Sequence, residues 1–231
     1  MTDTSFDGFP TDTIRFLAEL RANNNKPWFD EHKPDFEAFI MNPARAFVGA
    51  LGKRLRELSH DVVADPRVNK SIFRIYRDIR FSHDKTPYKT HLALLFWVGE
   101  GAKLENPGYY FHLDAENLLL GGGIYQFTKP MLKAYREAVV DPVQGPILAK
   151  IITALKTKGY DVGYQTYKRV PRGYSPDHKY AGLLRHSGVT LGKDLGLPEA
   201  LHTPALMDIC FEVYRDAKPI IDWLQQVKGA I

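Results

Sequence analysis

Apolar side chains alternate with charged or polar ones over residues 73–81, and no other feature of the chain restricts its fold as strongly. Successive side chains of a strand point to opposite faces, so the alternation predicts an extended strand. Arg77 falls on the apolar face, where a guanidinium needs a partner because its desolvation is costly. Asp78 is its neighbour but faces the other way, so the partner is expected elsewhere. The apolar face would also carry Phe73, Ile75, Ile79 and Phe81.

Three further apolar segments, residues 92–98, 109–114 and 118–125, follow in close succession and favour antiparallel pairing. The last two are joined through residues 115–117, which suit a hairpin. Apolar residues recur at helical spacing both before and after these segments. The order predicts an α+β fold with a central, mostly antiparallel sheet at about residues 71–125, flanked by N-terminal and C-terminal helices.

No linker-like stretch divides the 231 residues, so we expect a single globular domain over residues 1–231. A helical pattern runs from about residue 30 to residue 58 and contains Pro43. Proline lacks the N–H that a helix interior requires, so Pro43 is expected to divide this helical region in two.

Three consecutive glycines, Gly121 to Gly123, lie within the last predicted strand. Glycine weakens a strand, so three in a row require a cause. The cause can be a bulge or the close approach of another backbone, a ligand or a helix.

Composition excludes several classes of protein. The formal net charge is +4, which permits an acidic partner without requiring one. Cys210 is the single cysteine, so no internal disulfide can form and a reducing compartment is favoured. Residues 1–10 lack the basic and apolar regions of a signal peptide, and no apolar run approaches a membrane span. We therefore expect a cytoplasmic protein without a membrane partner.

A first basic cluster occupies residues 74–91 and predicts an anion site. Guanidinium forks suit phosphate and carboxylate oxygens. Asp78 stands between two arginines on one face of the predicted strand and could hold one or both of them. The expected ligand contacts are Arg74, Arg80, Lys85 and Tyr88, with Arg77 and Asp78 as structural support. The alternative is an ion-pair network that only supports the fold.

A second cluster combines basic and aromatic residues between residues 167 and 186. This composition is typical of surfaces that bind nucleotides or single-stranded nucleic acid, and also of solvated loops. Arg172, His178 and Arg185 are the members that could complete the far wall of the anion site.

Patterns for known catalytic and cofactor sites are absent: the sequence has no HExxH, CxxC, GxSxG or GxxxxGK[ST]. The histidines do not have metal-ligand spacing along the chain, so no metal and no cofactor is predicted. Asp78, His91 and His178 are the available acid–base groups, and the sequence does not choose among them.

At these residues the chain resembles the family catalogued as domain of unknown function 2461. The resemblance covers nearly the whole chain and implies one family domain of about this length, but no activity. Its central motif is Arg74-x-x-Arg77-Asp78-x-Arg80-Phe81, followed by Asp84-Lys85 and Tyr88. The other matching segments are Asn23-Asn24-Asn25 with Trp28-Phe29, Pro107-Gly108-Tyr109-Tyr110, Gly121-Gly122-Gly123, and Arg172-Gly173-Tyr174 with Asp177-His178.

Three functional hypotheses follow from the residues. The first is a pocket for a phosphorylated or carboxylate-bearing small molecule, with acid–base chemistry as an optional addition. The second is a nucleic-acid-associated protein that uses both basic clusters. The third is a structural or interaction module in which all the arginines are internally paired.

Overall fold

The computed structural model describes residues 5–163 and 167–231, and the contacts group them into two compact units. The first unit contains the described residues up to Phe96, together with Tyr110–Leu120 and Asp194–Glu212. The second contains Trp97–Tyr109, Val213–Ile231 and the described part of Gly121–Lys193. That the chain is a single domain stays a prediction.

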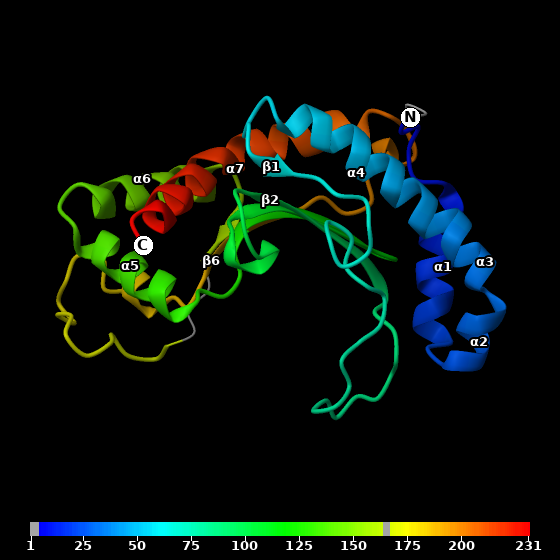
Figure 1. The fold of residues 1–231 in the computed structure, drawn as a ribbon, viewed down its shortest axis with the longest axis horizontal. Coiled ribbons are helices and arrows are strands. Elements are labelled where there is room, and N and C mark those ends of the chain that lie inside the picture. Colours follow the sequence, from blue (N-terminus) through cyan, green and yellow to red (C-terminus); the bar gives the residue numbers. More distant parts are fainter. Residues whose placement is uncertain (1–4, 164–166) are drawn as a thin grey trace. The chain divides into compact units, whose positions relative to one another are not determined.

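Helices precede and follow the strands, as the sequence predicts (Figure 1). The helices are α1 (Thr11–Ala22), α2 (Lys26–Glu31), α3 (Lys33–Phe36), α4 (Asn42–Leu55), α5 (Lys129–Val140), α6 (Gln144–Thr157) and α7 (Leu206–Gly229). A π-helical turn, Glu37–Met41, joins α3 to α4, and short 3-10 turns cover Lys103–Glu105, Leu183–Arg185 and Glu199–His202.

Six antiparallel strands form one sheet in the order β1-β2-β3-β4-β6-β5. They are β1 (Val62–Val63), β2 (His91–Val98), β3 (Gly108–Asp114), β4 (Leu118–Ile124), β5 (Asp161–Val162) and β6 (Val189–Asp194). The α+β class and the three central strands are confirmed. The sheet is larger than predicted, because β1 precedes the predicted sheet region and β5 and β6 come from the polar stretch that follows the helices.

The predicted strand at residues 73–81 is wrong as a strand of the sheet, although the chain there is extended. Residues 73–90, here called the arm, leave and return to the start of β2 as a long loop (Figure 1). Isolated bridges join Ile72 to Leu94 and Tyr76 to Tyr88, so the arm pairs briefly with itself and not in a continuous ladder. Exposure still alternates from residue 73 to residue 80, but Phe81 is 94% exposed and not on an apolar face.

Pro43 stands in the first turn of α4, directly after the π-helical turn, so the predicted division occurs there. Because proline has no N–H, the carbonyl of Phe39 loses its usual helical donor. The hydroxyl of Thr13 on α1 donates to this carbonyl at 2.6 Å instead. The break in the helix therefore supplies the acceptor that attaches α1.

Phenylalanine side chains form the centre of the first unit. Phe9, Phe47 and Phe111 are fully buried, and their ring centroids lie 5.0 to 5.8 Å apart. These rings join α4 to β3, and buried aromatic pairs of this kind stabilise a core beyond the area they bury. The core thus fixes β3, whose polar side chains contribute to the site described below.

The three glycines of β4 are required by the close approach of a neighbouring backbone. A Cβ at Gly121 would lie 2.1 Å from the carbonyl oxygen of Leu191, and one at Gly123 would lie 2.0 Å from that of Val189. Gly123 also has a φ of +117°, which L side chains rarely adopt. Of the causes considered from sequence, the approach of the β6 backbone is the one found.

No single helix in the described part of the chain is long and apolar enough to cross a membrane. The bent pair α5 and α6 meets that test only when the two helices are taken together.

Gly121→Ala is expected to lower the urea midpoint of unfolding, because its methyl group would displace the β6 backbone; overpacking of this kind costs about 1–3 kcal/mol. Gly49→Ala is the matched control, since nothing lies within 4 Å of a Cβ there and the residue is inside α4. Alanine in a helix interior should raise stability by about 0.5–1 kcal/mol. A neutral Gly121→Ala variant would contradict the close approach.

Candidate functional site

One side chain holds the returning part of the arm. Asn24, between α1 and α2, donates from Nδ2 to the Tyr88 carbonyl at 2.9 Å and accepts from the Tyr88 N–H at 3.0 Å. The amide thus replaces a neighbouring strand at this residue. The Tyr88 ring is buried and stacks on Phe29 of α2, with centroids 4.1 Å apart. Together these contacts fix the position of the residues just before β2.

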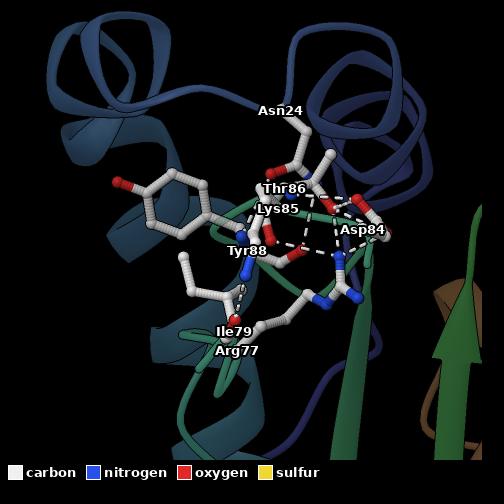
Figure 2. A network of polar contacts seen from close by, with 7 residues as sticks. All are labelled: Asn24, Arg77, Ile79, Asp84, Lys85, Thr86 and Tyr88. Carbon is white, nitrogen blue, oxygen red and sulfur yellow. Dashed lines mark hydrogen bonds and ion pairs between the residues drawn. The ribbon is translucent and has the colours of Figure 1, made fainter. Parts of the chain in front are cut away.

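Arg77 is oriented by the turn at Asp84 and Thr86 (Figure 2). Its Nη1 donates to Asp84 Oδ2 at 2.5 Å, to the Thr86 carbonyl at 3.1 Å and to the Thr86 hydroxyl. Its partner is therefore not Asp78, in agreement with the sequence prediction. Among the described residues all these bonds come from Nη1, so Nε and Nη2 keep their donors for another partner.

Arg77 lines a cavity of about 370 Å³, here called the Arg77 pocket. The wall is polar and belongs entirely to the first unit. Its residues are Arg21, Asn24, Arg77, Asp84, Thr86, Tyr88, Lys89, Thr90 and His91.

Positive charge exceeds negative charge in this wall, because Arg21, Arg77 and Lys89 face a single carboxylate, Asp84. Hydrogen bonds from the Thr86 N–H and from Arg77 lower the pKa of Asp84, so this carboxylate is ionised. Burial, followed by repulsion from Arg74, lowers the pKa of Lys89. A lowered lysine pKa means that the ammonium is incompletely compensated by its surroundings.

A pair of stacked imidazoles adjoins the pocket. The rings of His91 on β2 and His112 on β3 lie 4.2 Å apart, and only His91 lines the cavity. Burial first, and then the neighbouring His112 and Lys89, lower the pKa of His91 to about 4. His112 is held by the Tyr110 hydroxyl at 3.2 Å from Nδ1 and by Asp114 at 3.5 Å from Nε2. His91 is therefore a neutral imidazole at neutral pH.

The other predicted contacts of the first cluster lie outside the pocket lining. Arg80 is exposed and forms a bidentate pair with Asp78, at 3.0 Å from Nε and 2.7 Å from Nη2. This pairing lowers the pKa of Asp78 to about 2. Lys85 donates to the Ile79 carbonyl at 2.9 Å, and Arg74 is exposed. The structure thus places Arg77 and Tyr88 at the pocket, and it gives Arg80 the internal ion pair.

The second basic cluster belongs to the other unit. Arg172 is exposed there, and the ring of His178 accepts a hydrogen bond from the Tyr180 N–H at 3.1 Å. Arg185 ends a short 3-10 turn. Tyr167 lies under Arg136 at 5.1 Å, which is a cation–π contact. A shared wall formed by the two clusters therefore stays a prediction.

Asn24, Arg21 and His112 are members of this region that the sequence analysis did not assign to a site. Asn24 belongs to a run of asparagines, but nothing local in such a run indicates a contact 64 residues away. His112 could be found by register: it and His91 alternate with apolar residues on neighbouring strands. No group of three or more His, Cys, Asp or Glu within residues 5–163 and 167–231 is placed to hold a metal ion.

Asn24→Asp is expected to loosen the arm, because a carboxylate cannot donate to the Tyr88 carbonyl and leaves this acceptor unpaired at a cost of about 1–3 kcal/mol. Amide hydrogen exchange at Arg77, Tyr88 and Lys89 should accelerate. Asn25→Asp is the control, since its side chain caps α2 by accepting from Trp28, which aspartate does equally well. Unchanged exchange at Tyr88 in Asn24→Asp would show that the clamp is dispensable.

The free energy of unfolding is expected to fall between about pH 6.5 and pH 4. The pKa of His91 is about 4 in the folded chain against 6.5 in a model compound, so the unfolded chain binds more protons in this interval. The stabilisation is complete above the higher value, and its loss amounts to at most about 3 kcal/mol. His91→Gln should flatten the profile in urea titrations, whereas His60→Gln, at a side chain 98% exposed, should not. Equal slopes in all three proteins would contradict the assignment.

Comparison with known proteins adds a family and no activity. No curated protein and no solved structure matches the chain. A family model described as conserved hypothetical protein (DUF2461) matches residues 12–223, which include the arm, the stacked histidines and most of both units. The chain belongs to this DUF2461 family.

Proposed function

We propose that the first unit binds a phosphorylated or carboxylate-bearing small molecule in the Arg77 pocket. The observation that carries the proposal is the orientation of one guanidinium. Nη1 of Arg77 is used by Asp84 and Thr86, while Nε and Nη2 are left to form a fork toward a ligand. Two parallel donors of this kind match the two oxygens of a carboxylate or phosphate.

The charges around the pocket support an anion and not a cation. Arg21 is paired with Glu116 at 2.9 Å, and Arg77 with Asp84, so Lys89 is the cation with the least compensation. Its ammonium lies 5.5 Å from the Phe73 ring and is partly buried. An anion between Lys89 and Arg77 would restore the pKa of Lys89 and gain charge-assisted hydrogen bonds, each worth roughly 1.5–3 kcal/mol.

His91 is the acid–base group best placed for chemistry on such a ligand. It lines the same pocket and is neutral, so it can accept a proton or donate a hydrogen bond. A bound anion would raise its pKa and thereby favour proton uptake. Binding is the proposal here, and a reaction would need a ligand with an acidic proton next to His91.

Arg77→Lys is expected to weaken binding by roughly 10-fold or more, because lysine keeps the charge but loses the fork. The measurement is a thermal-shift screen of inorganic phosphate, sugar phosphates and small carboxylates, followed by calorimetric titration of the ligand that raises Tm most. Lys89→Gln should weaken the same ligand by removing the second charge.

Arg80→Gln is the matched control, since Arg80 is an arginine of the same arm that is paired with Asp78 and does not line the pocket. It should bind like the wild type. An equal loss in Arg80→Gln and Arg77→Lys would instead favour the sequence-based assignment to the outer arginines. If no anion in the screen raises Tm, the proposal fails, and salt-sensitive binding of single-stranded oligonucleotides would favour the nucleic-acid alternative.

A further inference from the structure

A second cavity, of about 380 Å³, lies within the second unit and shares no residue with the Arg77 pocket. One wall is a face of α6, and the opposite wall is the segment from Lys179 to His186. Its residues are Ala149, Ile152, Thr153, Lys156, Val162, Gly163, Lys179, Tyr180, Gly182, Leu183 and His186. We call it the His186 cavity.

Specific contacts hold the segment that forms the second wall. The buried hydroxyl of Tyr135 on α5 donates to the Leu183 carbonyl at 3.1 Å. The Tyr180 ring lies against Gly145 of α6, where an added Cβ would come within 3.1 Å of it. The cavity is therefore bounded by packed elements and not by a free loop.

The polar part of this wall is cationic. Lys156 and Lys179 both contribute, and the Lys179 ammonium lies 5.3 Å from the Tyr180 ring. No aspartate or glutamate lines the cavity. The uncompensated charge favours an anionic ligand.

His186 is the buried polar group of this wall. It is only 4% exposed, and its Nδ1 has no hydrogen-bond partner among the residues that the structure describes. Burial, followed by the positive charges of Lys156 and Arg185, lowers its pKa to about 4. Unsatisfied buried polar groups are rare in folded proteins and are concentrated at functional positions.

The rest of the wall is apolar, and this narrows the class of anion. Ile152, Val162 and Leu183 offer aliphatic surface and no hydrogen-bond donors from their side chains. A free phosphate has four oxygens that all require donors, whereas a carboxylate needs donors at one end only. An apolar body attached to that carboxylate would bury against the aliphatic side chains.

We propose that the His186 cavity binds a small carboxylic acid with an apolar body. The carboxylate lies between Lys156 and Lys179, and the body contacts Ile152, Val162 and Leu183. The site is separate from the Arg77 pocket and does not depend on the function proposed for it.

Four probes test the two halves of the proposal: benzoate, 3-phenylpropionate, benzyl alcohol and inorganic phosphate. The readout is the ring-proton NMR signal of His186, assigned by its absence in His186→Gln. Benzoate and 3-phenylpropionate should shift the signal saturably and raise the pKa of His186, because a bound carboxylate offsets the charge of Lys156. Benzyl alcohol lacks the charge and phosphate lacks the body, so both should bind at least 10-fold more weakly.

Lys156→Gln should weaken benzoate by roughly 10-fold, since it removes a charge-assisted contact. Lys150→Gln, at an exposed lysine of the same helix that does not line the cavity, should leave it unchanged. Arg77→Lys should also leave it unchanged, which separates this site from the Arg77 pocket. The proposal is overturned if no acid shifts the His186 signal, if phosphate binds as well as benzoate, or if Lys150→Gln weakens binding as much as Lys156→Gln.

Discussion

The arrangement of the candidate site depends on one amide that satisfies both backbone groups of one residue. Asn24 gives Tyr88 the donor and acceptor that a neighbouring strand would otherwise provide. Without it, the returning half of the arm would have to leave those groups to water. Because Lys89 and His91 follow within three residues, the clamp also sets where their side chains enter the pocket. Arg77 is tied to the same stretch, since its N–H donates to the Pro87 carbonyl at 2.9 Å. A contact between distant parts of the chain thus positions each charged member of the site.

Alternation predicted which arginine faces inward, although the segment is not a strand of the sheet. Side-chain alternation needs only an extended backbone, and the arm is extended without a continuous ladder. What alternation could not supply was the consequence of facing inward. We predicted that Arg77 would be structural and Arg80 would bind the ligand. The structure shows Arg80 paired with Asp78, two residues away, because a carboxylate at this spacing satisfies a guanidinium fork completely. The inner arginine, held at one nitrogen only, keeps the free donors.

The sheet shows a similar division between local and distant information. Residues 92–98, 109–114 and 118–125 were predictable because they are apolar and contiguous in sequence. β6 was not, since its partner on β4 is the glycine run and its own sequence, Val189–Asp194, lies in a polar stretch. Gly121 and Gly123 indicated that something approaches closely, but glycine records the absence of a side chain and not the identity of the neighbour. Identifying that neighbour required the fold.

Both cavities combine a neutral histidine with cations that have no carboxylate beside them in sufficient number. In water such cations would be screened, but beside a partly buried wall their repulsion persists and depresses the pKa of His91 and His186. The folded state alone bears this repulsion, so it lowers stability, and an anion is the species that can reverse it. Each histidine therefore reports on its own cavity: binding of an anion and uptake of a proton are linked and must strengthen each other. Since the two histidines belong to different units, a ligand that raises the pKa of only one of them identifies the cavity that it occupies.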